Sequence, residues 1–184
     1  MLKKVLVPLA EGVEEIEVIT IIDVLRRANI EVIVASLTDN LYVKGGHNIV
    51  IKADTTLEEI INYEFDAVAL AGGLGGMNNL KNDSRIIEKI KYMYENNKLV
   101  SAICASPIVL DEANVIKGKY TCFPSLESSI KNGKYMERDL VVCDNNIITS
   151  KGPATTILFA LEIVKYLNGN NEELSNALLI NLIK

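Results

Sequence analysis

Residues 99–107 have the sequence Leu-Val-Ser-Ala-Ile-Cys-Ala-Ser-Pro. The apolar beginning is typical of a buried strand, and Ser106-Pro107 suits the first turn of a helix, because proline loses no hydrogen bond there. Cys104 therefore lies at a predicted strand-to-helix turn. Ala102 and Ser106 lie two residues before and after it, and a nucleophile elbow needs small residues at these offsets.

A cysteine at such a turn lies over a helix N-terminus, where unpaired N–H groups and the helix dipole favour the thiolate. We therefore expect Cys104 to be a reactive thiol with a lowered pKa. The alternative interpretation is a small buried cysteine in a core strand, because free cysteine is among the most buried residue types. Cys122 and Cys143 lie in strand-like runs, and we expect both in the core.

The overall composition indicates one globular domain over residues 1–184. The net charge of -5, without a basic cluster, argues against nucleic-acid binding. No apolar run reaches membrane-spanning length, and the N-terminal one is too short for a signal peptide. Three cysteines in a chain of this size indicate a reduced, cytoplasmic protein. No Cys/His spacing resembles a metal site, so we expect neither a metal nor a cofactor.

Strand-like and helix-like segments alternate along the chain. Apolar strands are predicted at 4–9, 30–36, 66–71, 99–103 and 147–150, and helices at about 14–28, 84–96, 155–167 and 172–183. A hairpin or an excursion from the sheet is predicted at 41–53, a short helix ending at 62, and less regular strands within 118–145. Fully apolar strands alternating with helices predict a mostly parallel sheet that helices cover on both faces.

Three of the predicted strands end in residues with useful chemistry. Glutamates 11, 14, 15 and 17 follow the first strand, Gly72-Gly73 follows the third, and Cys104 follows the fourth. Ligands of open α/β sheets bind at these carboxyl ends, so a carboxyl group, backbone N–H groups and a thiol can meet there. Alternatively, the glutamates form a solvated first helical turn and the glycines at 72–76 an ordinary turn. The glycines lack the Gly-Lys-Ser/Thr ending of a phosphate loop.

Four segments carry a family resemblance. They are Gly-Val-Glu-Glu-Ile-Glu at 12–17, Ala-Gly-Gly at 71–73, Ala-Ile-Cys-Ala-Ser-Pro at 102–107 and Thr-Ser-Lys-Gly-Pro-Ala-Thr at 149–155. In order and spacing they resemble the ThiJ/PfpI superfamily, most of all its DJ-one/ThiJ branch, over nearly the whole chain. The resemblance implies a flavodoxin-like three-layer α/β/α sandwich, a homodimer, and an oxidation-sensitive Cys104 hydrogen-bonded to a protonated Glu17.

The same resemblance assigns further residues. It implies that Gly72, Gly73 and Ala105 line an oxyanion pocket. It places five residues near the pocket or the dimer interface: Glu14, Arg27, His47, Gly152 and Pro153. A pocket arginine of the family falls on His47, the only histidine of the chain. Phe123 stands where some relatives carry a histidine.

The resemblance implies three kinds of activity. These are glyoxalase or deglycase action on small aldehydes or glycated substrates, redox sensing, and chaperone-like protection. Ala105 counts against protease activity, because the peptidase branch has histidine there. No histidine follows Cys104, which excludes an amidotransferase triad. An enzyme, a non-enzymatic sensor and an inactive structural relative therefore remain as hypotheses.

The first predicted helix is apolar on more than one face. We expect its core stripe to consist of Ile16, Ile19, Ile22 and Leu25. Val18, Ile21 and Val24 are then left over, whereas a soluble helix needs one apolar stripe for its own core. Together with the resemblance, this predicts a homodimer interface that includes the first helix and the Gly152-Pro153 turn.

Overall fold

The computed structural model describes residues 2–182, which fold around a seven-stranded sheet. The strands are β1 (Lys4–Leu9), β2 (Glu31–Ser36), β5 (Thr55–Thr56), β6 (Ala67–Leu70), β7 (Leu99–Ile103), β10 (Val141–Asp144) and β11 (Ile147–Ser150). Their order is β10-β11-β7-β6-β1-β2-β5, and all neighbours are parallel except β10 and β11. The five central strands follow the 2-1-3-4-5 order of flavodoxin-like folds. The predicted mostly parallel α/β fold is confirmed.

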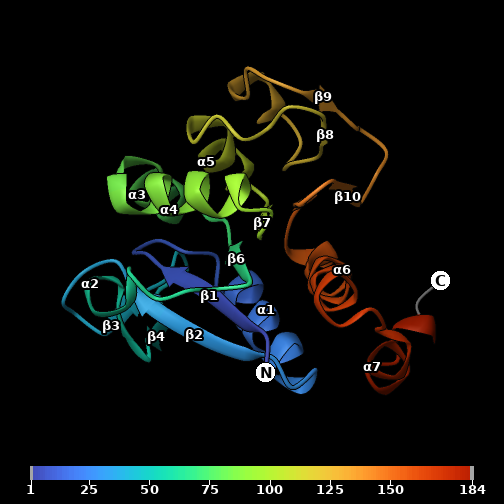
Figure 1. The fold of residues 1–184 in the computed structure, drawn as a ribbon, viewed down its shortest axis with the longest axis horizontal. Coiled ribbons are helices and arrows are strands. Elements are labelled where there is room, and N and C mark those ends of the chain that lie inside the picture. The colour runs from blue at the N-terminus through green and yellow to red at the C-terminus, as the bar shows by residue number, and fades with distance from the viewer. Residues whose placement is uncertain (1, 183–184) are drawn as a thin grey trace.

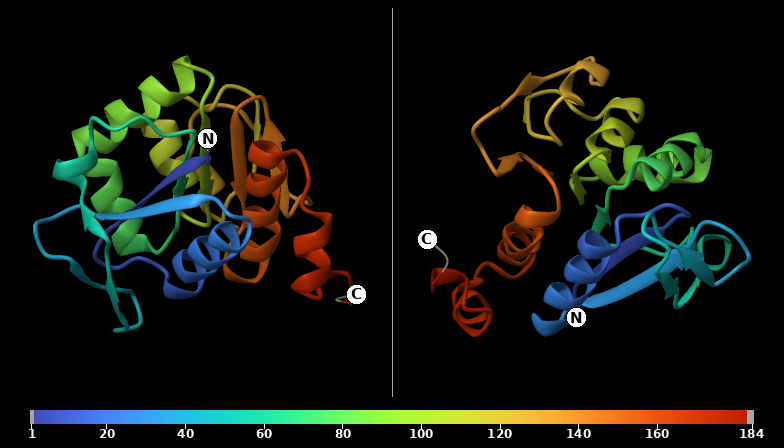
Figure 2. Two further views of the ribbon diagram at one scale, coloured as in Figure 1. Left: turned by 60° about the horizontal axis from the view of Figure 1, so that its bottom comes forward. Right: turned by 180° about the vertical axis from the view of Figure 1, so that it is seen from behind.

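Helices cover both faces of the sheet (Figure 1). One face carries α1 (Glu15–Arg27) and α6 (Thr156–Asn168), and α7 (Glu172–Ala177) lies beyond α6. The other carries α2 (Leu57–Ile60), α3 (Leu74–Asn82), α4 (Ser84–Glu95) and α5 (Pro107–Glu112). The views of Figure 2 show the same two helical layers from other sides.

Each helical layer has its own hydrophobic core, because successive side chains of a strand point to opposite faces. In β1, Val5 and Val7 pack toward α1 and α6, whereas Leu6 packs toward the α2–α5 layer. The five residues of β7 are all buried. This burial on both faces explains why the central strands are apolar without alternation.

Smaller elements lie outside the central sheet. The predicted hairpin is confirmed as antiparallel β3 (Tyr42–Lys44) and β4 (Val50–Lys52). The irregular region contains β8 (Lys119–Tyr120), β9 (Lys134–Tyr135) and the 3₁₀ helix η1 (Glu127–Ser129). Two more 3₁₀ helices are η2 (Pro153–Thr155) and η3 (Ile180–Leu182). Between residues 2 and 182, no helix has the length and apolar character needed to cross a membrane.

The glycine-rich segment after β6 differs from the predicted turn. The loop consists of residues 71–73, so of these glycines only Gly72 and Gly73 lie in it, and α3 begins at Leu74. A Cβ atom at Gly76 would lie 2.9 Å from the Cα atom of Val13. The glycines of this helix therefore allow its first turn to approach the loop after β1, an advantage that outweighs their low helix propensity.

The rotation of α1 is also different from the prediction. Val18, Ile21 and Val24 face the core with Leu25, whereas 59% of Ile16 and 49% of Ile19 are exposed. Both sets of residues follow helical spacing, so periodicity could not distinguish them. The N-terminal turn also buries Glu15 and Glu17. The two buried carboxylates lie beside the loops at the carboxyl ends of the strands. This position fixes the rotation of α1 about its axis, and the rotation turns Ile16 outward.

Two further expectations were wrong in part. Cys122 is buried as predicted, but Cys143 is exposed, because it lies on the edge strand β10 with its side chain directed opposite to buried Val142. The last helix, α7, ends at Ala177, and Leu179 has a φ of 57° that breaks the helix before η3. The predicted helix end at residue 183 lies outside the described residues.

Candidate functional site

The candidate site lies where the carboxyl ends of β1, β6 and β7 meet. These three strands are neighbours in the sheet. The chain leaves β1 toward α1 on one face and leaves β6 toward α3 on the other. Strand order therefore reverses between β1 and β6, and open α/β sheets bind their ligands in the crevice at such a point.

Cys104 occupies the connection between β7 and α5. Its φ is 64°, in the left-handed region that non-glycine residues rarely adopt. The Cys104 N–H donates to the Ser150 carbonyl at 3.0 Å, and its own carbonyl accepts from the Phe123 N–H at 2.8 Å. The Ser106 hydroxyl donates to the Ala71 carbonyl at 2.6 Å. These bonds hold the backbone in this conformation and leave the thiol half-buried.

Glu17 lies beside Cys104 and is fully buried. Its Oε2 accepts a 2.6 Å hydrogen bond from the Gly72 N–H. Its Oε1 has no hydrogen-bond partner within residues 2–182. A Cβ atom at Gly72 would lie 2.6 Å from the Cys104 Cβ and 2.8 Å from Glu17 Oε2. Only glycine at position 72 therefore lets the loop, the carboxyl and the thiol pack together.

The surroundings of the pair shift both pKa values upward. Burial raises the pKa of Glu17 to about 7. Burial, followed by the charge of Glu17, raises the pKa of the Cys104 thiol to about 12, although the Gly73 and Ala105 N–H groups lower it. The pair therefore holds two protons below about pH 7 and one above it. At neutral pH this site keeps a proton that the two groups can share.

The predicted lowering of the Cys104 pKa is therefore wrong. The prediction relied on the helix that follows, but α5 has only six residues and begins with Pro107, which has no N–H group. The expectation also counted neither the loss of solvent around the thiol nor the carboxylate next to it. Both effects disfavour the thiolate and outweigh the nearby backbone N–H groups.

The structure brings most of the other predicted residues to the same place. Glu14 precedes α1, and its N–H donates to the Gly72 carbonyl at 3.0 Å. A Cβ atom at Gly152 would lie 3.3 Å from the Phe123 ring and 4.0 Å from Cys104 Sγ, so Gly152 borders the thiol. Pro153 follows it and begins η2.

Arg27 is not brought to the pocket of its own chain. It lies in the last turn of α1, at the opposite end from Glu15. A helix of 13 residues is about 20 Å long, and this length separates Arg27 from the carboxyl ends of the strands, where Cys104 lies. Its Nε atom instead pairs with Asp23 Oδ2 at 2.7 Å on the surface. A role in a dimer interface stays a prediction.

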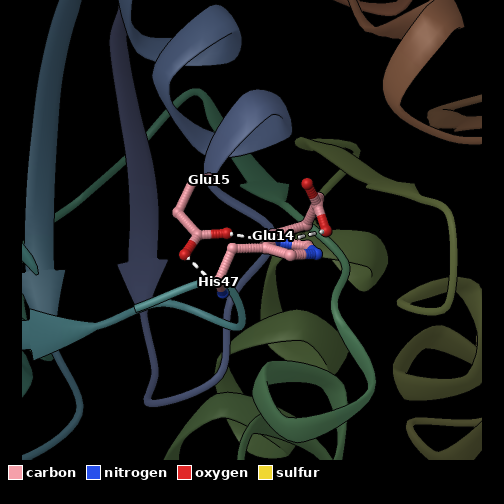
Figure 3. Close-up of side chains that lie close together, drawn as sticks. All are labelled: Glu14, Glu15 and His47. Atoms are coloured by element: carbon pink, nitrogen blue, oxygen red, sulfur yellow. Dashed lines mark hydrogen bonds and ion pairs between the residues drawn. The ribbon is translucent and has the colours of Figure 1, made fainter. Parts of the chain in front are cut away.

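His47 reaches the start of α1 from the β3–β4 hairpin (Figure 3). Its Nδ1 lies 2.9 Å from Glu15 Oε2 and 3.6 Å from Glu14 Oε2, while 70% of its side chain is exposed. The hydrogen bond to Glu15, followed by the charges of Glu14 and Glu15, raises the pKa of His47. Burial acts to raise the pKa of Glu15, but hydrogen bonds from the His47 side chain and backbone leave it below its ordinary value.

Sequence reasoning missed two residues of this region. Glu15 was indistinguishable from its neighbouring glutamates, and its contact with His47 joins segments 32 residues apart. Phe123 was noted as a replacement for histidine, but nothing in the sequence indicated that its ring lies beside Gly152. In the structure, the 44% exposure of Phe123 indicates a binding role, because a large exposed aromatic ring next to a thiol can contact a ligand.

Comparisons with known proteins identify the same family over most of the chain. Residues 3–166 match the DJ-1/PfpI family. Protein dj-1beta of Drosophila melanogaster is 40% identical over 184 residues, covering 98% of both chains. Its namesake crystal structure, Drosophila melanogaster DJ-1beta, has a TM-score of 0.94 at 39% identity and covers 97% of this chain and 98% of that one.

Two further matches are a longer protein and a structure described as oxidized. Protein DJ-1 homolog B of Arabidopsis thaliana is 39% identical over 181 residues, which are 96% of this chain but 41% of the plant protein. The chain thus spans less than half of that relative. The structure described as Toxoplasma gondii DJ-1, oxidized, has a TM-score of 0.88 at 34% identity and covers 98% of both chains.

Proposed function

This chain belongs to the DJ-1/PfpI family, and on that premise we propose that it converts small reactive carbonyl compounds, as a glutathione-independent glyoxalase or deglycase. The observation that supports this proposal is the pairing of Cys104 with Glu17. A half-buried thiol lies beside a buried carboxyl whose Oε1 has no partner among the described residues. A nucleophile and a proton carrier are the two groups that addition to an aldehyde requires.

The first step is addition of the thiol to the aldehyde. Cys104 transfers its proton to Glu17, and Sγ forms a bond to the aldehyde carbon. The carbonyl π electrons move to oxygen, which takes the proton from Glu17 and completes a hemithioacetal. While charge develops on this oxygen, we expect the Gly73 and Ala105 N–H groups, which lie beside Sγ, to stabilise it.

For methylglyoxal, the remaining steps need no external oxidant. Glu17 takes the proton from the carbon bonded to sulfur and returns it to the neighbouring carbon, while the hydroxyl proton on the first carbon passes to the oxygen on the second. The first carbon is thereby oxidised to a thioester and the second is reduced to an alcohol. Water then cleaves the resulting thioester and restores the thiol. The sum is methylglyoxal plus water giving lactate, and for this reason the reaction proceeds without glutathione.

Lactate formation is therefore the direct test. Purified protein is incubated with methylglyoxal without glutathione, and lactate is measured enzymatically. We expect turnover with the wild type, loss of at least about a hundredfold in Cys104→Ser and Glu17→Gln, and no loss in Cys143→Ser. Cys143 is the matched control, because it is exposed on β10, away from the site. Turnover that survives in Cys104→Ser would refute the proposal.

A second function is favoured by a specific observation on a relative. The Toxoplasma gondii structure is described as oxidized, and Cys104 lies in a fold of the same kind. We infer a redox sensor in which peroxide converts Cys104 to a sulfinate. Each of two peroxide molecules supplies one oxygen atom to sulfur and is reduced to water. A protonated Glu17 can donate a hydrogen bond to the sulfinate oxygen.

Two measurements distinguish sensor from enzyme. Intact protein mass after graded peroxide should show two added oxygen atoms, and Cys104→Ser should lack them. If oxidation occurs at Cys104 and lactate is not formed by the wild type, the sensor function holds and the enzyme is refuted. Oxidation that survives in Cys104→Ser and is lost in Cys143→Ser would refute the sensor.

We also propose that the chain forms a homodimer through α1. Ile16 and Ile19 are large apolar side chains on this helix, and about half of each is exposed. A soluble helix that exposes two isoleucines one turn apart gains free energy when a second surface covers them. A second copy supplies a surface with the same apolar character, and the Gly152-Pro153 turn is the other expected part of this interface.

A further inference from the structure

We propose that Glu14, Glu15 and His47 form a binding site for a first-row divalent cation of the zinc class. These residues offer one imidazole nitrogen and two carboxylate oxygens, and the three ligand atoms all lie within 4.8 Å of one another. They come from the start of α1 and from the β3–β4 hairpin (Figure 3). Because the two segments lie 32 residues apart, no local sequence spacing indicated this cluster.

The distances suit a small tetrahedral cation. Zinc bonds to nitrogen and oxygen are about 2.0–2.1 Å long, which places two tetrahedral ligands about 3.3 Å apart. His47 Nδ1 lies 2.9 Å from Glu15 Oε2 and 3.6 Å from Glu14 Oε2. These two separations fall on either side of the ideal value. The third, between the Glu14 and Glu15 oxygens, is within 4.8 Å, so rotation of the largely exposed His47 side chain and of Glu14 can bring the three atoms to one cation.

Hydrogen bonds already orient the Glu15 carboxylate in the way that a metal ligand is oriented. Its side chain is 5% exposed, and Oε1 accepts hydrogen bonds from the His47 N–H at 2.7 Å and from the Ile49 N–H at 3.4 Å. These backbone bonds leave Oε2 with His47 Nδ1 as its partner. Metal-binding carboxylates are oriented in this way by hydrogen bonds to the oxygen that does not bind. The backbone of the hairpin therefore supplies the outer shell of the site.

The charges around the cluster also favour a cation. Within residues 2–182, the ion pairs of Glu14 and Glu15 are both with His47, and neither carboxylate pairs with lysine or arginine. Two carboxylates therefore face a single imidazole, and the cluster attracts positive charge, either as a proton on His47 or as a metal cation. Imidazole favours zinc-class ions over Mg²⁺ and Ca²⁺, which prefer oxygen ligands alone.

A proton on His47 is the competing occupant. The imidazolium would pair with both glutamates through the same Nδ1 atom that the cation needs. Cation binding must therefore release this proton, and affinity should fall as the pH is lowered. The exposed side of His47 leaves the remaining coordination position open to water, and the Glu14 N–H bond to Gly72 places the cluster at the rim of the Cys104 site.

The single histidine makes the test direct. The variant Cys104→Ser is used throughout, so that no Cys104 thiolate can bind the metal. Nitrogen NMR of the one imidazole is recorded at pH 7.5 while Zn²⁺ is added, and Mg²⁺ is added in a parallel sample. We expect a saturable shift of the Nδ1 resonance at one Zn²⁺ per chain, and no shift with Mg²⁺.

Matched variants decide whether the proposed ligands are responsible. Glu14→Gln and Glu15→Gln should each weaken Zn²⁺ binding at least about tenfold. Glu11→Gln removes the same charge from the same loop outside the cluster and should leave binding unchanged. Glu14→Gln keeps the test decisive if buried Glu15 proves necessary for folding. Zn²⁺ that fails to shift Nδ1, or that shifts it equally in Glu14→Gln and Glu11→Gln, overturns the proposal.

Discussion

The Ser106 hydroxyl donates a 2.6 Å hydrogen bond to the Ala71 carbonyl, and both residues are buried. This bond joins the start of α5 to the end of β6, two elements that flank Cys104 and Gly72. The turn that carries Cys104 and the loop that carries Gly72 are therefore hydrogen-bonded to each other directly. This bond adds to the hydrogen bonds between strands β6 and β7.

Replacing Ser106 with alanine should destabilise the fold. The Ala71 carbonyl would lose its side-chain partner in a place that water does not reach, which costs about 1–3 kcal/mol. Chemical denaturation of Ser106→Ala measures this loss. Ser128→Ala is the control, because Ser128 makes a long, exposed bond to Ser125 and its loss should change stability by less than about 0.5 kcal/mol. Equal stability of the two variants would contradict the assigned role of Ser106.

Glu17→Gln should separate alkylation from catalysis. The charge of Glu17 helps to raise the Cys104 pKa, and an uncharged glutamine removes that contribution while still offering a hydrogen-bond donor. We expect iodoacetamide at pH 8 to modify Cys104 about tenfold faster or more, since one pKa unit is a tenfold change in thiolate. Lactate formation should be lost. Peptide mapping follows Cys104, with exposed Cys143 as the internal reference.

Gly72→Ala should abolish turnover without unfolding the protein. The new Cβ atom would lie 2.6 Å from the Cys104 Cβ and 2.8 Å from Glu17 Oε2, which forces the thiol and the carboxyl apart. We expect at least about a hundredfold lower kcat, because misplacement by about 1 Å is enough for such a loss. Gly46→Ala is the control, since its Cβ would meet the nearest atoms at ordinary distances of 3.6 and 3.7 Å. Similar losses in both variants would argue against a specific role for Gly72.

Asp66 should make stability depend on pH in the acid range. It accepts hydrogen bonds from the Lys4 N–H at 3.0 Å and from Lys3 Nζ at 3.2 Å. Burial acts to raise the Asp66 pKa, but these bonds and the charges of Lys3 and Lys98 lower it below its ordinary value. A lowered pKa in the folded state gives stability that is present above the unfolded value of about 3.9 and is lost as the pH falls through the folded value.

The measurement for Asp66 compares the wild type with Asp66→Asn. Melting temperatures should differ clearly at pH 7, with the wild type higher, and the difference should shrink between about pH 4 and pH 2. Asp39→Asn serves as a control for removal of a loop carboxylate. A difference that stays constant across this range would show that Asp66 acts through packing and not through its charge.

The proposed dimer should depend on the exposed isoleucines of α1. The double variant Ile16→Glu, Ile19→Glu places like charges on both copies of the surface and should give a monomer of about 20.3 kDa by light scattering, against a dimer for the wild type. Leu179→Glu changes another exposed apolar residue, in the C-terminal segment, and should leave the wild-type mass unchanged. A monomeric wild type at micromolar concentration would refute the interface.

Much of the fold could be predicted because the local sequence patterns were strong and no long-range contact overrode them. Residues 4–9 were predicted as a strand, and β1 has these bounds, since an apolar run between polar residues has few other solutions. The helix after Asp83 was also predicted, and Asp83 does accept from the Arg85 N–H. The hairpin followed from two short β-like runs around Gly45-Gly46.

The errors came from contacts that no local pattern contains. Gly75 and Gly76 have low helix propensity, and only the approach of the Gly12-Val13 backbone explains why they are helical. The rotation of α1 depends on where Glu17 is buried, and periodicity treats Ile16 and Val18 as equivalent. The Cys104 pKa depends on desolvation and on a carboxyl 87 positions away in the sequence.

The positive φ of Cys104 sets the thiol against the local stability of the backbone. A left-handed conformation costs a non-glycine residue about 1–2 kcal/mol, and glycine adopts it without strain. Cys104→Gly therefore relieves local strain while it removes the thiol. Backbone strain alone therefore favours glycine at this position, and the thiol is present in spite of that strain.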